Sequence, residues 1–270
     1  TTDAIAQTKT LLKKRVPIFE GSFAYKDGYC KADILNPVNQ DEWDLIEVKS
    51  STKVKDEHID DASFQRWCIA GAGVKLRRIH LMFVNNEYVR QGGIDPARLL
   101  SMQDVTDGVA LKLPEVEPNL NKMVSIIRGP MPSVEFGVDC KTPKECPICS
   151  ADLEGSDVVE LYRIGAKAWP LVNSGIRSIK DLPTDFALNA KQQIQRRATE
   201  TGNAQTDKKA IQKFLNGLKY PLYCLDFETI GPAIPLYDGT RPYQQVPFQF
   251  SIHVLPRIGG APEHFEFLAD

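Results

Sequence analysis

Residues 44–51 read DLIEVKSS, an apolar strand pattern that carries a carboxylate and an ammonium group two positions apart. Successive side chains of a strand point to opposite faces of a sheet, so Glu47 and Lys49 share one face and Ile46 and Val48 share the other. We expect Ile46 and Val48 to anchor a central strand in the core. The charged pair on the second face is then either a solvated ion pair or the wall of a site.

The segments around this strand follow an order that is typical of an α/β fold. Periodicity and turn signals predict the following elements: a helix over 3–15, a hairpin with its turn at Asp27-Gly28 and a strand over 29–35, the central strand over 42–51, a helix from about Asp56 to the Gly71/Gly73 pair, and a strand over 77–89. This order predicts a mixed sheet flanked by helices.

The remainder of the chain changes character twice. Residues 95–135 are mixed and interrupted by prolines, with one short helix expected near 96–104, whereas residues 157–216 are polar and helical. From residue 221 onward the pattern predicts three strands, with a loop rich in proline and glycine after the first. We therefore expect three segments, with boundaries at 1–150, 151–218 and 219–270.

Composition and charge favour a soluble globular protein over a membrane-spanning or globally basic one. Of the 270 residues, 42% are hydrophobic and 25% charged, which is typical of a soluble globular protein. No apolar run is long enough to span a bilayer, and the first residues lack the apolar centre of a signal peptide, so we expect a cytoplasmic protein without a membrane partner. A net charge of −2 excludes a globally basic nucleic-acid binder but leaves local basic patches open.

Four residues around the central strand form the first candidate site. Asp33 lies near the end of the strand before Glu47 and Lys49, and Gln65 lies on the helix that follows. Two carboxylates can hold Mg²⁺ or Mn²⁺, which polarises a phosphoryl oxygen and activates a bound water, while a lysine offsets developing charge. The set predicts a phosphodiester nuclease. The alternative is a solvated sheet face whose charge pair contributes only ~0.2–1 kcal/mol.

The pattern Asp33, Glu47-Val48-Lys49, Gln65 resembles the RecB-type branch of the PD-(D/E)xK nucleases. This resemblance implies a restriction-endonuclease-like mixed sheet, with Asp33 and Glu47 as metal ligands, Lys49 as the catalytic lysine and Gln65 as a helper. The sequence departs from the pattern one turn after Gln65, where Cys68 and Ile69 stand in place of the usual tyrosine. The competing interpretation is a non-cleaving module that uses the same fold to bind nucleic acid or protein.

Three of the six cysteines cluster as Cys140, Cys146 and Cys149. In a chain without a secretion signal this spacing favours metal over disulfides, although a full site needs four ligands and no fourth Cys or His lies nearby. Some RecB-type nucleases, including CRISPR-associated ones, hold an iron–sulfur cluster through three such cysteines and a fourth ahead of the nuclease core. The resemblance implies a [4Fe-4S] cluster, or zinc, in the complete protein. Three unligated thiols are the alternative.

A second acidic pair lies on the strand over 221–230, where Asp226 and Glu228 share one face. Asp-x-Glu on a first strand resembles the opening motif of DEDD-type exonucleases, which have an RNase H-like fold. It implies two ligands of a second metal site that is incomplete here. The stretch from Pro232 to His253 strengthens a resemblance to an uncharacterised bacterial family that joins both nuclease types. Two exposed charges on an edge strand are the alternative.

The helical middle resembles a helix-hairpin-helix unit, in which glycines such as Gly165 and Gly175 let backbone amides approach phosphate. Cationic side chains would add to such a DNA contact: Lys167, Arg177, Lys191, Arg196 and Arg197. A helical linker with a solvated basic face is the alternative. Taken together, the sequence predicts a divalent-metal-dependent nuclease acting on single- or double-stranded DNA, as an exonuclease or a DNA-processing enzyme.

Overall fold

The computed structural model describes residues 2–131, 133, 136–141, 145–151 and 153–269. It divides into two compact units, one formed by residues 1–131 together with 221–270 and the other by residues 132–220. The cysteine cluster, which we expected to belong with the first segment, lies in the second unit. The C-terminal strands, which we expected to form a separate domain, are grouped with the first unit.

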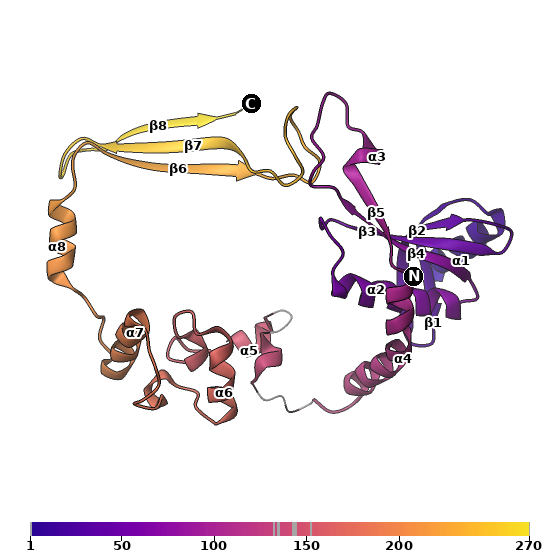
Figure 1. Cartoon of the computed structure of the whole chain (residues 1–270), viewed down its shortest axis with the longest axis horizontal. Helices are drawn as coiled ribbons and strands as arrows, with labels where there is room; N and C mark the ends of the chain where they lie inside the picture. The colour runs from indigo at the N-terminus through magenta and orange to yellow at the C-terminus, as the bar shows by residue number, and fades with distance from the viewer. Residues whose placement is uncertain (1, 132, 134–135, 142–144, 152, 270) are drawn as a thin grey trace. The chain divides into compact units, whose positions relative to one another are not determined.

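The first unit contains a five-stranded sheet in the order β1-β2-β3-β4-β5 (Figure 1). Its strands β3 and β4 are parallel, and the other neighbouring strands are antiparallel. The elements in chain order are α1 (Thr2–Lys14), β1 (Ile18–Tyr25), β2 (Gly28–Pro37), β3 (Glu42–Lys49), α2 (Asp56–Gly71), β4 (Lys75–Val84), α3 (Pro96–Leu99), β5 (Leu100–Asp104) and α4 (Thr106–Arg128). The expected mixed sheet flanked by helices is confirmed.

The core of this unit lies on one face of the sheet, which we call the helix-covered face. Trp43 and Leu45 of β3 are buried there with Cys68 and Ile69 of α2. On the opposite face of β3, Val48 is 39% exposed. The expectation that Ile46 and Val48 anchor β3 in the core is therefore wrong. Both faces of β3 carry two apolar side chains, and α2 packs over the face with the larger ones.

The hairpin between β1 and β2 turns one residue earlier than expected. Tyr25 pairs with Gly28, so the turn consists of Lys26 and Asp27. Gly28 lies inside the strand because α2 passes close to it: a Cβ at this position would stand 2.7 Å from the ring of Trp67. The glycine thus serves packing between sheet and helix, and not the turn.

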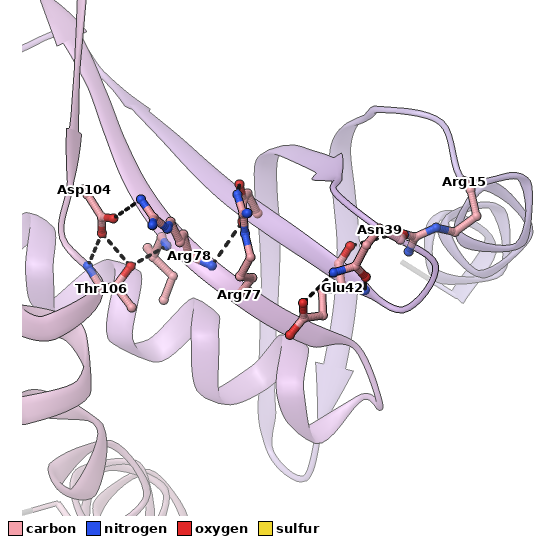
Figure 2. A network of polar contacts seen from close by, with 9 residues as sticks. Arg15, Asn39, Glu42, Arg77, Arg78, Asp104 and Thr106 are labelled. Carbon is pink, nitrogen blue, oxygen red and sulfur yellow. Dashed lines mark hydrogen bonds and ion pairs between the residues drawn. The ribbon is translucent and has the colours of Figure 1, made fainter.

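A bulge between β3 and β4 is closed by a buried acid. The register shifts after Trp43, and Asp44 fills the gap by accepting hydrogen bonds from the Arg77 guanidinium at 3.0 and 2.7 Å and from the Arg78 backbone at 3.1 Å. Figure 2 shows the next link, in which Asp104 lies between the Arg78 guanidinium and Thr106. These contacts tie β3, β4 and β5 together at the end of the sheet where β3 begins.

The segment 95–135 differs from the expectation of one short helix near 96–104. It forms the four-residue helix α3, the strand β5 and the 23-residue helix α4. Proline in a helix interior removes a backbone hydrogen bond and usually ends the helix. Pro114 and Pro118 lie four residues apart on the exposed side of α4, while Val109 on the other side is buried in the core. Packing therefore outweighs the local effect of the two prolines.

The C-terminal strands form a separate three-stranded antiparallel sheet, as expected from their alternation. Its strands are β6 (Leu222–Ile230), β7 (Val246–Leu255) and β8 (Glu263–Leu268). In the second unit, α6 (Ala168–Asn173) contributes to a small apolar core, and α7 (Ala190–Thr201) and α8 (Lys208–Asn216) follow. Over the described ranges of the chain, no helix has both the length and the apolar character that crossing a bilayer requires.

The assignment of faces on β3 is testable by truncation. Leu45 is completely buried, so Leu45→Ala should lower the free energy of unfolding by about 2–5 kcal/mol in urea denaturation. Val48→Ala, on the opposite face, serves as the matched control and should cost less than about 1 kcal/mol. A larger loss for Val48→Ala than for Leu45→Ala would contradict the face assignment.

Candidate active site

Asp33 lies where β2 and β3 separate. The two strands are paired from Pro37 opposite Trp43 to Ile34 opposite Ile46, and Asp33 is the next residue of β2. Its carboxylate Oδ2 accepts a hydrogen bond from the backbone N–H of Val48 at 2.7 Å. The carboxylate thereby replaces the backbone carbonyl of β2 that would otherwise pair with Val48. It lies near Glu47, the residue before Val48.

The position of Asp33 depends on a change of phase in the hairpin. Ala32 and Leu35 are both completely buried although they are three residues apart, so the in-and-out alternation of β2 reverses at Asp33 and Ile34. Opposite this point on β1, Glu20 has a positive φ of 56°, which is uncommon for a residue other than glycine. Glu20 itself is exposed and lies 3.8 Å from Lys31.

Glu47 is buried on the helix-covered face and is only 6% exposed. Burial raises the pKa of its carboxyl group above the ordinary value; Lys49 and Gln65 oppose this shift, and the negative charge of Asp33 adds to it. Among the described residues, its Oε2 atom is buried without any hydrogen-bond partner. A buried carboxylate oxygen of this kind is costly unless a cation or a donor compensates it.

Lys49 links Glu47 to a third carboxylate that the sequence analysis missed. Its ammonium group donates to Glu47 Oε1 at 2.8 Å and also to Asp61 of α2. Burial lowers the pKa of Lys49, but the hydrogen bonds to Asp61 and Glu47 outweigh it and the pKa is raised. Lys49 is therefore held charged between two elements. Asp61 precedes Gln65 by one helical turn, and this spacing is the signal that could have identified it.

Gln65 projects from α2 toward Glu47. It is buried, it lowers the pKa of Glu47, and its Oε1 is a second buried oxygen without a hydrogen-bond partner among the described residues. One turn later, where the RecB pattern has a tyrosine, Cys68 and Ile69 are completely buried. The Cys68 thiol contacts the backbone carbonyl of Phe23 at 3.6 Å. This turn of α2 thus faces the core.

The donors fit a hard divalent cation. Mg²⁺ is usually bound through one or two carboxylates and keeps several waters, so it needs no larger cage. Asp33 and Glu47 are such a pair, and Oε2 of the buried Glu47 has no hydrogen-bond partner among the described residues. No group of three or more His, Cys, Asp or Glu side chains is arranged for a metal in the described part of the chain.

The second acidic pair lies on the polar face of the C-terminal sheet. Asp226 pairs with Ser251 of β7, which in turn pairs with Glu266 of β8, and Glu228 pairs with Gln249. The opposite face of this sheet is apolar and includes Leu225, Phe227, Phe250, Ile252, Phe265 and Phe267. Both carboxylates of the pair are exposed, in contrast to Glu47.

The three clustered cysteines approach one another in the second unit. The backbone N–H of Cys146 donates to the carbonyl of Cys140 at 2.7 Å. Hydrogen bonds with the thiols of Cys140 and Cys146 contribute to raising the pKa of Cys149 to about 12. Backbone N–H groups of Cys149 and Ile148 lower the pKa of Cys146. The three cysteines are thus in hydrogen-bond contact with one another, and a metal or iron–sulfur cluster held by them stays a prediction.

The basic residues of the second unit are not equally available to a ligand. Arg196 donates to the backbone carbonyl of Leu182 at 3.1 Å and to Glu200 at 2.7 Å, and Arg177 stacks over Phe136 at 4.3 Å. Lys167 and Arg197 are exposed. Gly165 and Gly175 both have positive φ, of 55° and 85°, a conformation that glycine adopts readily. A DNA contact at this unit stays a prediction.

Comparison with known proteins bears on the C-terminal end of the chain. The model of a domain of unknown function, DUF2779, matches residues 223–270, the segment that contains β6, β7 and β8. No curated protein and no solved structure matches the chain.

The burial of Glu47 predicts a pH-dependent effect on stability. A carboxyl group whose pKa is raised by folding stabilises the protein below its unfolded-state pKa of 4.5, and this contribution is lost as the pH rises through the folded-state pKa. Glu47→Gln removes the buried charge and leaves Lys49 its contact with Asp61. In metal-free buffer at pH 8, we expect Glu47→Gln to raise the free energy of unfolding by about 1 kcal/mol.

The same measurement at pH 4 is the internal control, because Glu47 is then protonated in the folded protein and the two proteins should differ less. A Glu47→Gln protein that is less stable than wild type at pH 8 would show that the Lys49 contact, and not the burial of charge, dominates at this position.

Proposed function

We propose that this chain is a divalent-metal-dependent nuclease that hydrolyses phosphodiester bonds in DNA, as an exonuclease or a DNA-processing enzyme. One observation carries the proposal: Glu47, a carboxylate buried between sheet and helix, has an oxygen without a partner in the described chain and stands beside Asp33, Lys49 and Gln65. A buried, partly uncompensated acid with a raised pKa is more typical of a functional site than of a structural ion pair.

Each residue of the set has a role that its environment supports. Asp33 and Glu47 would hold Mg²⁺ or Mn²⁺, which supplies polarisation of the phosphoryl oxygen and a more acidic bound water. Lys49 is fixed by Glu47 and Asp61, so its charge is positioned to offset charge developing on the phosphate without further reorganisation. Gln65 presents a buried carbonyl oxygen that can accept a hydrogen bond from a bound water.

The order α1, β1, β2, β3, α2, β4 and the parallel pair β3–β4 support the RecB-type, restriction-endonuclease-like form of this fold. Asp33 at the separation of β2 and β3 supports it further, because the metal-binding pair then comes from neighbouring strands. The polar face of the C-terminal sheet, with Asp226 and Glu228, supports the reading of residues 219–270 as the first part of an RNase H-like domain.

Two further elements of the proposal concern the second unit. The convergence of Cys140, Cys146 and Cys149 supports a [4Fe-4S] cluster or zinc that is completed by a ligand from elsewhere in the complete protein. The exposed Lys167 and the positive φ of Gly165 support contact with the DNA backbone, which would be independent of base sequence.

A second candidate function is supported by the position of Lys49. Its ammonium group already neutralises part of the charge on Glu47, so the set can persist without a metal. A module with this fold that binds nucleic acid or protein without cleaving it would need no metal at Glu47, because the ion pair with Lys49 compensates the charge. Metal uptake and turnover separate the two candidates.

Removal of the lysine charge tests turnover. With Mn²⁺ and single- or double-stranded DNA, Lys49→Ala should reduce the cleavage rate about 10²–10³-fold, the effect of removing a preorganised group that stabilises transition-state charge. Lys53→Ala, at an exposed lysine four residues further along, is the matched control and should cleave like wild type. Equal rates for wild type and Lys49→Ala would place any activity at another site.

Calorimetry with Mn²⁺ tests metal uptake without relying on turnover. We expect wild type to bind the ion and Asp33→Asn to weaken binding at least about tenfold, since one of two carboxylate ligands is lost. Asp41→Asn, at an exposed acid in the turn before β3, should bind like wild type. Identical heats for Asp33→Asn and wild type would favour the non-cleaving module.

A further inference from the structure

The loop between β6 and β7, residues 231–245, returns to the first sheet and is bound there by Arg90. The backbone N–H of Arg90 donates to the carbonyl of Thr240 at 3.1 Å, and the N–H of Gly239 donates to the carbonyl of Arg90 at 2.9 Å. The Arg90 guanidinium donates to the carbonyls of Pro235, at 3.0 Å, and Leu236. A charged donor shared by two carbonyls makes a strong and directional contact.

Packing supports the same attachment. Pro235 is completely buried, and Ala233 packs against the cluster of Val84, Tyr88 and Leu99 that closes the end of β4. Asp238 accepts a hydrogen bond from the backbone N–H of Gly92 at 2.9 Å. Because backbone hydrogen bonds, side-chain hydrogen bonds and apolar contacts all join this loop to residues 84–99, the loop is an integral part of the first unit.

The far end of the loop reaches the strand that carries the candidate active site. The hydroxyl of Tyr243 donates to the backbone carbonyl of Ser50, the residue that follows Lys49. Tyr243 has a positive φ of 60°, a conformation that persists in a non-glycine residue only where its surroundings hold it. The next carbonyl, that of Ser51, accepts the N–H of Val84 at 3.0 Å. Tyr243 and Val84 therefore together fix the chain as it leaves β3.

We infer that Tyr243 is a positioning residue for Lys49, and that loop 231–245 acts as a latch that Arg90 holds in place. The latch fixes the end of β3 so that the Lys49 ammonium stays between Glu47 and Asp61. It lies within the segment that DUF2779 matches, so this segment contributes to the first candidate site as well as carrying Asp226 and Glu228. The part of the inference that concerns turnover rests on the proposed nuclease function.

Hydrogen exchange on the full chain tests the latch without relying on activity. Tyr243→Phe deletes one oxygen, and it should speed amide exchange in residues 50–53 and at Val84 about 3- to 10-fold, the effect of one lost hydrogen bond on local opening. Arg90→Lys keeps the charge but lacks the second guanidinium nitrogen, so it cannot donate to the carbonyl of Gly92 and to those of Pro235 and Leu236 together, and it should also speed exchange in 231–245. The matched control is Tyr237→Phe, because Tyr237 serves this loop through its backbone carbonyl.

Steady-state kinetics with Mn²⁺ and DNA give the second readout. Tyr243→Phe should lower kcat about 3- to 10-fold with KM unchanged, because Tyr243 acts through Lys49 and does not touch the substrate. Exchange in residues 50–53 that is the same in Tyr243→Phe, Arg90→Lys and Tyr237→Phe would overturn the latch. If Tyr243→Phe exchanges faster than wild type but wild type itself cleaves no DNA, the latch is supported and only the nuclease function is contradicted.

Discussion

Glu47 lies in the layer of side chains between the sheet and α2, where a carboxylate is costly unless its charge is compensated. Much of the local structure follows from that constraint. Lys49 bends back to one of its oxygens, Asp61 on α2 holds the lysine in place, and Gln65 lies alongside. Asp33, a second negative charge, stands close enough to raise the pKa of Glu47 further. The cation that we propose between Asp33 and Glu47 would compensate this negative charge.

Four residues of the candidate site were predicted from the sequence, but Asp61 and the face of β3 on which Glu47 and Lys49 lie were not. Their arrangement along two strands and a helix, together with its resemblance to the RecB-type pattern, predicted Asp33, Glu47, Lys49 and Gln65. Alternation placed Glu47 on the wrong side of β3, because Trp43 and Leu45 on one face are as apolar as Ile46 and Val48 on the other. Alternation also breaks in β2, where the order of buried and exposed residues reverses at Asp33. A strict period of two along β2 therefore cannot predict which face of the sheet Asp33 occupies.

Other features depend on contacts that a local pattern does not contain. The helix α4 forms despite Pro114 and Pro118 because one of its sides packs against α2, and local propensity alone would divide it. Asp61 of α2 belongs to the candidate site only because it pairs with Lys49 of β3. The contact of Tyr243 with Ser50 joins residues 193 positions apart, and nothing near either residue indicates the other. These are the parts of the site that required the three-dimensional structure.

The claim that Glu47 and Asp33 form a metal site is tested most directly by anomalous diffraction from crystals of the chain soaked in Mn²⁺. The account predicts a manganese peak in contact with carboxylate oxygens of both Asp33 and Glu47, at about the 2 Å separation of hard cations from oxygen ligands. Crystals in which manganese is bound elsewhere, with the Glu47 oxygen still buried and unligated, would contradict it.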